Sequence, residues 1–400
     1  MDTPNGQTQA FVRQHCDDDP LRLALQAVRP EGVDMAYALT QIDGRQRMRR
    51  KVPSWAAKEG IVYPQHLSVE QCSSEATARY KALVVSAAGG HKSLADLTGG
   101  MGIDCYFMHS AFTETTYVER RQELADITEH NFKVLGADNI SVLCADGIDH
   151  LRSMEPVDWL FMDPARRSGS GAKTVALSDC EPDVVPLLPL LLQKAGHVML
   201  KLSPMLDISM ALRQMPHATE VHVVAVDNEC KELLVVMDRD GGMTAEDVTV
   251  HCVNLLHNGT SQTFTFSKFD EQDECQYAHT IAKYLYEPNA AVLKAGAYRT
   301  VARKYRLEKL HPSSHLYTSD NLVTDFPGRT FAVDDYGSMS RPDLRRLLDG
   351  TSKANLAIRN FPSSVAELRK RLHLGDGGDV YLFATTMADG RKVLVRCSKR

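Results

Sequence analysis

Two acidic motifs, about sixty residues apart, combine residue types that could hold a cofactor and position a substrate. The first is Asp96-Leu97-Thr98-Gly99-Gly100-Met101-Gly102-Ile103-Asp104, where an apolar run ends in an acidic residue and a glycine-rich turn before a helical pattern begins. Backbone N–H groups in such a turn can closely approach a small ligand. The second is Trp159-Leu160-Phe161-Met162-Asp163-Pro164-Ala165-Arg166-Arg167, where another apolar strand ends in a carboxylate beside a proline. The motifs predict a cofactor loop and a reaction edge on one sheet.

Two more carboxylates follow the neighbouring predicted strands. Glu119 closes one of them and could accept hydrogen bonds from both hydroxyls of a ribose. The alternative is a helix N-cap or first-turn carboxylate before Gln122. Asp146 follows the next strand and could accept from an adenine amine; the alternative is the N-cap of the following helix. We interpret the cofactor as S-adenosylmethionine and its candidate site as Asp96, Thr98, Gly100, Gly102, Glu119 and Asp146.

A nicotinamide cofactor is the alternative for this half of the site, because about 20 residues between the glycines and an acidic residue are also typical of dinucleotide-binding folds. Two features argue against it. Cys105 stands where the third glycine of that fingerprint would be, and Asp163-Pro164-Ala165-Arg166 has no role in hydride transfer.

The Asp163 motif resembles the Asp/Asn-Pro-Pro-aromatic tetrapeptide of methyltransferases that act on exocyclic amines of bases. In those enzymes the acidic or amide side chain and a proline carbonyl accept hydrogen bonds from the amine and orient its lone pair, so catalysis is mainly alignment. Here Ala165 replaces the second proline and Arg166 replaces the aromatic ring. Stacking would have to come from a guanidinium plane or from elsewhere. The alternative is a buried Asp-Pro turn without a catalytic part.

Cations follow both this motif and a later strand. The segment 166–173 forms a basic loop that could grip phosphates or could be a mobile surface loop. In Lys201-Leu202-Ser203-Pro204, the lysine could steer an anionic substrate or pair with Asp163 or Asp207. The candidate catalytic residues are therefore Asp163, Pro164, Arg166 and Lys201, and the candidate substrate-binding residues are Arg167, Lys173 and Ser203.

Covalent and metal chemistry have no signature in the sequence. No cysteine beside Asp163-Pro164 suggests a carbon-directed covalent mechanism. The fifteen histidines are scattered, and no His/Cys cluster has metal spacing. We read the histidines as ordinary and predict no metal.

The elements that must position these residues alternate between short β-rich runs and amphipathic segments from 91 to 237. This pattern is typical of repeated βαβ units and a mostly parallel sheet. The expected helices are Gln122–Leu135 and Val184–Lys194, and the expected strands are 93–97, 115–119, 140–144, 157–162, 197–202, 221–226 and 232–237. The last two runs should form an antiparallel hairpin at the sheet edge. Seven strands with this ending predict an α/β, Rossmann-like class I methyltransferase domain.

The flanking regions differ from this domain. Residues 8–90 read as helical, with a basic cluster at Arg45, Arg47, Arg49, Arg50 and Lys51 that could contact phosphates or form a solvated helix face. A linker is expected after Asp240-Gly241-Gly242, where a strand-like run from Val248 to Phe266 leads into a more irregular region. The final segment reads as a small α+β domain that closes with a hairpin of Val380–Thr385 and Lys392–Arg396.

The composition indicates which cellular compartment and which binding partners to expect. The nine cysteines are odd in number and include no Cys-x-x-Cys pair, and no stretch of about 18 uncharged apolar residues occurs. We therefore expect reduced thiols, a cytoplasmic location and no membrane partner. The net charge is −5, yet residues 290–400 hold 20 Lys and Arg against 11 Asp and Glu. A local excess of basic residues is expected of a nucleic-acid-binding module, with a solvated charged surface as the alternative.

On longer strings the chain resembles bacterial class I SAM-dependent methyltransferases that carry a C-terminal THUMP-like domain. The strings are 70–81, Asp96–Gly102, Met162–Arg167, Lys201–Pro204, Glu229–Leu234 and, in the closing hairpin, Asp376–Thr385. The resemblance implies a ferredoxin-like piece near 279–321 and a THUMP-like module near 322–396. We divide the chain into an N-terminal helical region at 1–90, a methyltransferase domain at 91–240, a linker and ferredoxin-like domain at 241–321, and a THUMP-like domain at 322–400.

THUMP domains in better-known enzymes hold RNA, so the resemblance implies RNA, such as tRNA or rRNA, by analogy. The first hypothesis is methylation of a base amine in structured RNA. The alternatives are a small-molecule or protein methyltransferase, and a non-catalytic RNA-binding protein with a relic methyltransferase domain. The sequence gives no handle on the oligomeric state.

Overall fold

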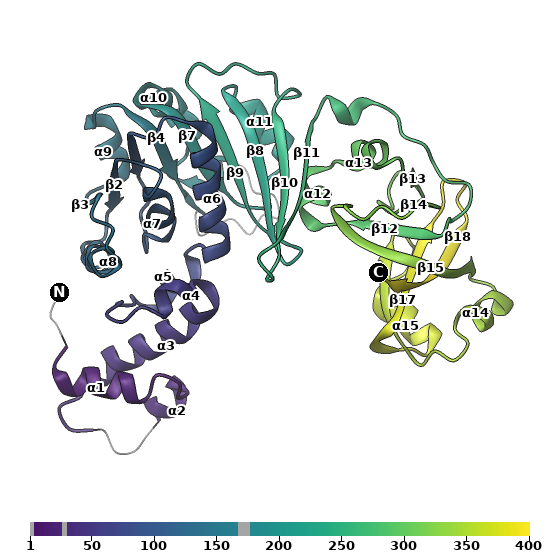
Figure 1. The fold of residues 1–400 in the computed structure, drawn as a ribbon, viewed down its shortest axis with the longest axis horizontal. Coiled ribbons are helices and arrows are strands. Elements are labelled where there is room, and N and C mark those ends of the chain that lie inside the picture. The colour runs from purple at the N-terminus through teal and green to yellow at the C-terminus, as the bar shows by residue number, and fades with distance from the viewer. Residues whose placement is uncertain (1–3, 26–29, 167–176) are drawn as a thin grey trace. The chain divides into compact units, whose positions relative to one another are not determined.

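The computed structural model describes residues 4–25, 30–166 and 177–400, and Figure 1 shows their fold. The chain forms two compact units. Unit 1 comprises Met1–Thr219 and Leu234–Gly242, and unit 2 comprises Glu220–Leu233 and Met243–Arg400. Each unit contains its own cluster of buried apolar side chains.

Helices fill the N-terminal region of unit 1, as predicted. The side chains of Asn5, Asp19, Asp34 and Ser74 accept a backbone N–H at the start of four of these helices, which explains where each begins. The longest, α3, has 17 residues, and no described helix is long and apolar enough to cross a bilayer. The helices are α1 (Gly6–Gln14), α2 (Pro20–Ala24), α3 (Met35–Lys51), α4 (Pro53–Ala56), α5 (His66–Gln71) and α6 (Glu75–Ala88).

The strands of the Rossmann-like part of unit 1 lie where the sequence predicts them, but the helix predicted at Val184–Lys194 begins only at Leu188. Its parallel strands pair in the order β3-β2-β1-β4-β7. Helix α8 has the predicted bounds, and Gly136 ends it with a φ of 74°. The elements are β1 (Ser93–Asp96), α7 (Ile103–His109), β2 (Glu114–Glu119), α8 (Gln122–Leu135), β3 (Ile140–Cys144), α9 (Gly147–Ser153), β4 (Val157–Met162), β5 (Ala165–Arg166), β6 (Cys180–Glu181), α10 (Leu188–Lys194), β7 (Ala195–Leu202) and α11 (Ile208–Gln214).

The predicted hairpin forms, from β8 (Ala218–Val226) and β9 (Glu229–Asp238), but its predicted position at the sheet edge is wrong. The sheet has nine strands in the order β11-β10-β8-β9-β7-β4-β1-β2-β3. The strand-like run from Val248 to Phe266, assigned above to the linker and ferredoxin-like segment, supplies β10 (Thr249–Leu255) and β11 (Ser261–Ser267), and β10 pairs in parallel with β8. Pairing satisfies the backbone groups that an edge strand would leave open, and it buries Val250, Cys252 and Phe264.

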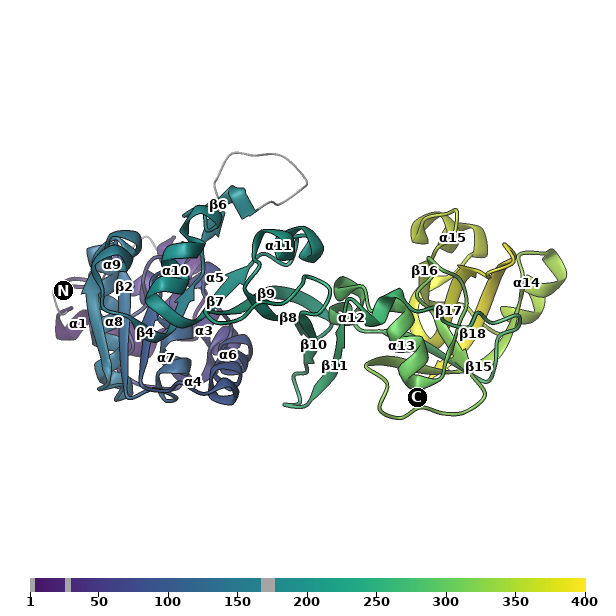
Figure 2. The ribbon, with the colours of Figure 1, turned by 90° about the horizontal axis from the view of Figure 1, so that it is seen from above.

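Unit 2 also contains a seven-stranded sheet in the order β13-β14-β12-β15-β18-β17-β16. Helices α14 and α15 lie beside this sheet (Figure 2). Leu347 of α14 and Leu368 of α15 belong to one apolar cluster with Leu382 and Leu394 of the sheet. The predicted closing hairpin is confirmed as β17 and β18. The elements are β12 (Tyr284–Pro288), α12 (Ala290–Ala295), α13 (Tyr298–Tyr305), β13 (Glu308–Lys309), β14 (Tyr317–Ser319), β15 (Gly328–Ser338), α14 (Arg341–Leu347), β16 (Lys353–Arg359), α15 (Val365–Leu372), β17 (Gly375–Thr386) and β18 (Lys392–Lys399).

Candidate active site

Four predicted site residues lie at one edge of the nine-stranded sheet. Asp96 and Glu119 end β1 and β2, Asp163 follows the last residue of β4, and Lys201 is the penultimate residue of β7. These strands are parallel neighbours, so their carboxyl ends meet at the same edge. Ligands of open α/β sheets bind at that edge.

The glycine-rich loop after β1 is held in one shape by hydrogen bonds at its own backbone. The N–H of Gly99 donates to the carbonyl of Val118 at 2.9 Å, and the N–H of Gly102 donates to the carbonyl of Gly99 at 2.8 Å. The carbonyl of Gly100 accepts from the hydroxyls of Tyr117 and Thr128. The loop is therefore preorganised by β2 and α8.

Two of its glycines are required for different reasons. Gly102 has a φ of 74°, and a Cβ there would lie 2.6 Å from side-chain atoms of both Thr128 and Phe132. Gly100 has a φ of 56°, but a Cβ there would meet nothing closer than the carbonyl of Thr98 at 3.8 Å. The backbone at Gly100 therefore faces space that no side chain fills, as a loop that lies against a small ligand needs.

Alanine at Gly102 is expected to destabilise unit 1 by about 2–4 kcal/mol, because left-handed backbone strain adds to a clash with α8. Alanine at Gly136 is the matched control: its φ is also 74°, but a Cβ there meets nothing within 4 Å. Urea unfolding followed by tryptophan fluorescence measures the difference, since both tryptophans, Trp55 and Trp159, lie in unit 1. Equal losses in the two variants would mean that contact with α8 does not constrain the loop.

The two carboxylates predicted to hold a nucleoside have local partners and spare acceptor capacity. Glu119 is buried and accepts from the backbone N–H of Gly100 at 3.0 Å and of Arg121 at 2.9 Å. Asp146 is exposed and caps α9 with one oxygen, which accepts from the N–H groups of Ile148 and Asp149. A carboxylate offers about four acceptor positions, so both can also accept from a ligand. Their chemistry fits the hydroxyls and the amine of a nucleoside.

Thr98 joins the glycine-rich loop after β1 to the residue that follows β4. Its hydroxyl accepts a 2.7 Å hydrogen bond from the backbone N–H of Asp163, and its own N–H donates to Asp96 at 3.0 Å. Burial raises the pKa of Asp96 to about 8, so this side chain is mostly protonated at neutral pH. Asp96 thus acts as a neutral anchor of the loop, and Asp163 is fixed directly beside it.

A line of alternating charges leads from Asp163 into the protein. Lys201 forms an ion pair with Asp163, and its Nζ also lies 3.9 Å from a carboxylate oxygen of Asp104 on α7. The other oxygen of Asp104 lies 3.1 Å from Nζ of Lys81 on α6. Burial alone would raise the pKa of Asp104, but the positive charges of Lys81 and Lys201 lower it. The carboxylate of Asp104 therefore stays charged and holds both lysines.

Lys81 and Asp104 are missing from the predicted site, although both belong to motifs named above. The side chain of Lys81 has no exposed surface, and the hydroxyl of Ser73 donates to Asp104 at 2.6 Å. Lys81 follows Thr77 and precedes Val85 at four-residue spacing on the buried face of α6. A lysine at such a position was the available signal, because a buried lysine needs a partner.

The structure describes only some of the remaining residues that were predicted to catalyse the reaction or bind the substrate. Arg167 and Lys173 lie outside the described residues, and of Arg166 only the backbone, in β5, is described. Pro164 is buried. The hydroxyl of Ser203 accepts from the N–H of Met205 at 3.2 Å in the turn after β7.

Local partners engage part of the basic cluster on α3. Arg47 pairs with Asp43 and Glu70, and Arg49 pairs with Asp17. Surface pairs of this kind contribute little stability. They favour the solvated helix face over a phosphate site at these two positions.

Two family models match unit 2. A ferredoxin-like domain matches residues 284–327, and a domain described as THUMP domain-like matches residues 328–399. The boundary between them coincides with the start of β15 at Gly328.

Two relatives cover more of the chain. A crystal structure from Porphyromonas gingivalis W83, described as that of a candidate methyltransferase, is 37% identical, covers 100% of both chains and superposes with a TM-score of 0.89. An uncharacterised S-adenosylmethionine-dependent methyltransferase of Mycobacterium tuberculosis H37Rv is 23% identical over 266 residues, which are 66% of this chain and 69% of that protein. The fold of this chain therefore matches that of the Porphyromonas gingivalis protein over its full length.

Proposed function

Because the chain belongs to a family of S-adenosylmethionine-dependent methyltransferases with C-terminal ferredoxin-like and THUMP-like domains, we propose that it methylates an exocyclic amine of a base in structured RNA. The observation that carries the proposal is the position of Asp163. Its backbone is bonded to Thr98 of the cofactor loop, and its side chain is 36% exposed. An acceptor amine that reaches Asp163 is therefore next to the cofactor loop.

The candidate cofactor residues would divide the ligand between them. Glu119 would accept from the ribose hydroxyls, Asp146 from the adenine amine, and the bare backbone at Gly100 would lie against the ligand. When bound, S-adenosylmethionine supplies a methyl group made electrophilic by the adjoining sulfonium.

Asp163 has two tasks in this scheme. Its carboxylate accepts a hydrogen bond from the amine N–H, which aims the nitrogen lone pair, and it can take the proton that the nitrogen loses on methylation. Lys201 holds this carboxylate in place. The carbonyl of Pro164 would be the second acceptor for the amine.

RNA is the acceptor class that the chemistry of unit 2 favours. Residues 290–400 carry 20 basic against 11 acidic side chains, and the matched THUMP-like domain covers most of this stretch. Basic groups attract a phosphate backbone whatever its sequence. In this scheme Arg166, Arg167, Lys173 and Ser203 would contact the acceptor close to the reacting base.

The test is transfer of tritiated methyl from S-adenosylmethionine by the purified full-length protein to total RNA from a strain that lacks it. DNA and protein fractions serve as parallel acceptors. We expect label in RNA, followed by identification of the nucleoside through digestion and mass spectrometry. Label in protein alone, or no label despite cofactor binding in calorimetry, would reject RNA as the substrate.

A further inference from the structure

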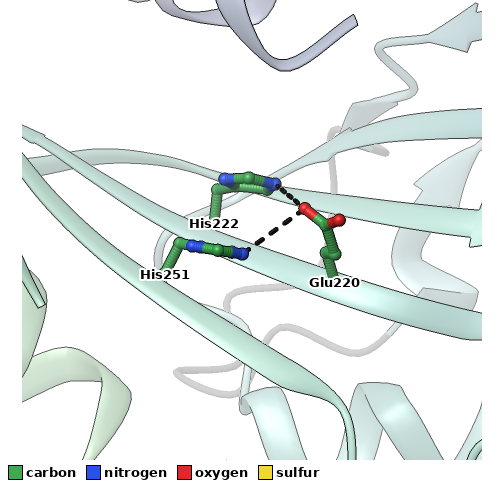
Figure 3. A group of neighbouring side chains, drawn as sticks. All are labelled: Glu220, His222 and His251. Atoms are coloured by element: carbon green, nitrogen blue, oxygen red, sulfur yellow. Dashed lines mark hydrogen bonds and ion pairs between the residues drawn. The ribbon is translucent and has the colours of Figure 1, made fainter. Parts of the chain in front are cut away.

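Three side chains with metal-binding groups, one glutamate and two histidines, meet on one face of the nine-stranded sheet. They are Glu220 and His222 of β8 and His251 of β10, and all three lie in unit 2 (Figure 3). Nothing in the proposed methyl transfer uses them. No spacing along the chain brings the two histidines together, so their pairing could not be predicted from the sequence.

Strand register produces the cluster. β8 and β10 pair in parallel with His222 opposite His251, so the two imidazoles rise from neighbouring strands on the same face. Their rings stack with centroids 4.6 Å apart and an interplanar angle of 12°. Glu220 lies two residues before His222 and therefore shares that face. The backbone thus fixes all three side chains on rigid elements.

One ligand atom from each of the three side chains lies within 4.8 Å of the other two. Nε2 of His222 lies 3.1 Å from a carboxylate oxygen of Glu220, and Nε2 of His251 lies 3.4 Å from the same oxygen. Bond lengths of about 2.0–2.1 Å in a tetrahedral zinc site imply ligand atoms roughly 3.3 Å apart. We propose that Glu220, His222 and His251 bind a divalent transition-metal ion of the zinc type.

The donor set indicates the class of ion. Two imidazole nitrogens and one carboxylate oxygen suit Zn²⁺ and similar first-row ions, whereas Mg²⁺ and Ca²⁺ prefer oxygen ligands. Three protein ligands leave a further position for water. The side chains of His251 and Glu220 are 29% and 41% exposed, which gives the ion and the water access, while that of His222 is only 5% exposed.

A second contact orients one ligand. The hydroxyl of Thr265 on the next strand, β11, lies 3.2 Å from Nδ1 of His251. When Nε2 binds a metal, Nδ1 carries the hydrogen and the Thr265 hydroxyl can accept it, which is the usual arrangement of a metal-bound histidine. The ion would join β8 to β10 and so stabilise the folded state by mass action.

The test is isothermal titration of the chelator-treated full-length protein with ZnCl₂, with MgCl₂ as the control ion. We expect saturable 1:1 binding of Zn²⁺ that weakens about a hundredfold in His251→Gln and in Glu220→Gln, because loss of a ligand costs at least as much as loss of its supporting partner. His257→Gln is the matched control: His257 pairs with Asp227 at 3.2 Å, but this pair is exposed and has a single imidazole. That variant should bind Zn²⁺ like the wild type.

Two further measurements keep the proposal open to refutation. Zn²⁺ should raise the Tm of the wild type and of His257→Gln but not that of His251→Gln, and circular dichroism checks that each variant is folded. Co²⁺ should give tetrahedral d–d absorption without thiolate-to-metal bands, which excludes binding by the nine cysteines. Absence of saturable binding, or binding of equal strength in His251→Gln, would overturn the proposal and leave a hydrogen-bonded Glu-His-His cluster.

Discussion

Asp163→Ala is expected to lower the rate constant of methyl transfer by about a hundredfold to a thousandfold while leaving the affinity for S-adenosylmethionine within about twofold of the wild-type value. The amine N–H becomes more acidic as the new bond forms, so a hydrogen bond to Asp163 strengthens in the transition state and contributes to kcat rather than to binding. The backbone N–H of residue 163, which bonds to Thr98, survives the substitution. Initial rates of tritium transfer to RNA and calorimetric titration with the cofactor measure the two quantities.

Asp163→Asn is the matched variant, because the amide retains an acceptor oxygen of the same size. It should lose activity by only about tenfold if alignment dominates, since alignment needs an acceptor rather than a charge. Full activity in Asp163→Ala would remove Asp163 from the site. Equal, large losses of activity in both variants would mean that Asp163 acts mainly by removing the proton and not by aligning the amine.

Lys81→Met should destabilise unit 1 by about 3–5 kcal/mol, because it leaves the buried carboxylate of Asp104 without its nearest cation. The tryptophan signal of unit 1 reports this loss in urea. The matched control is Lys133→Met on α8, where Lys133 pairs with Glu129 at 2.7 Å but is 71% exposed. The control should cost less than about 1 kcal/mol.

The loss should also depend on pH in a fixed direction. In the wild type the pKa of Asp104 is lowered, so its contribution to stability is present above its unfolded pKa of about 3.9 and disappears as the pH falls through the lower folded value. In Lys81→Met the carboxyl remains buried and protonates at higher pH. The difference in free energy of unfolding between the wild type and Lys81→Met should therefore narrow as the pH falls from 7 toward 5. Adding Asp104→Asn to Lys81→Met should recover part of the lost stability. A difference in free energy of unfolding that does not depend on pH would mean that Lys81 stabilises unit 1 through the packing of its aliphatic stem and not through its charge.

The sequence predicts the strands of the Rossmann-like part because each strand there is a short apolar run, and several of these runs end at or directly before an acidic residue. Asp96 with its glycines, Glu119 and Asp163 mark three strand ends, and parallel pairing then brings them to one edge. Local signals are sufficient where adjacent elements pair in a common pattern.

Other features depend on contacts that no local pattern encodes. Pairing of β10 with β8 is one, because an apolar run shows that a strand is buried but not which strand it joins. Lys81 is another, since its partner Asp104 follows it by more than twenty residues on a different helix. His251 meets His222 only through the register of two strands. In each case tertiary structure, rather than propensity, chooses the partner.

The hydroxyl of Thr98 gives the two loops one hydrogen bond in common, and this has a thermodynamic consequence. A ligand that changes the position of the loop after β1 necessarily acts on the backbone of Asp163, and an acceptor bound at Asp163 acts in return on that loop. Linkage requires the two effects on affinity to be equal in size. Cofactor and acceptor are therefore expected to bind as a coupled pair. When the thioether product of the cofactor dissociates, the affinity of the protein for the acceptor should change through the same hydrogen bond.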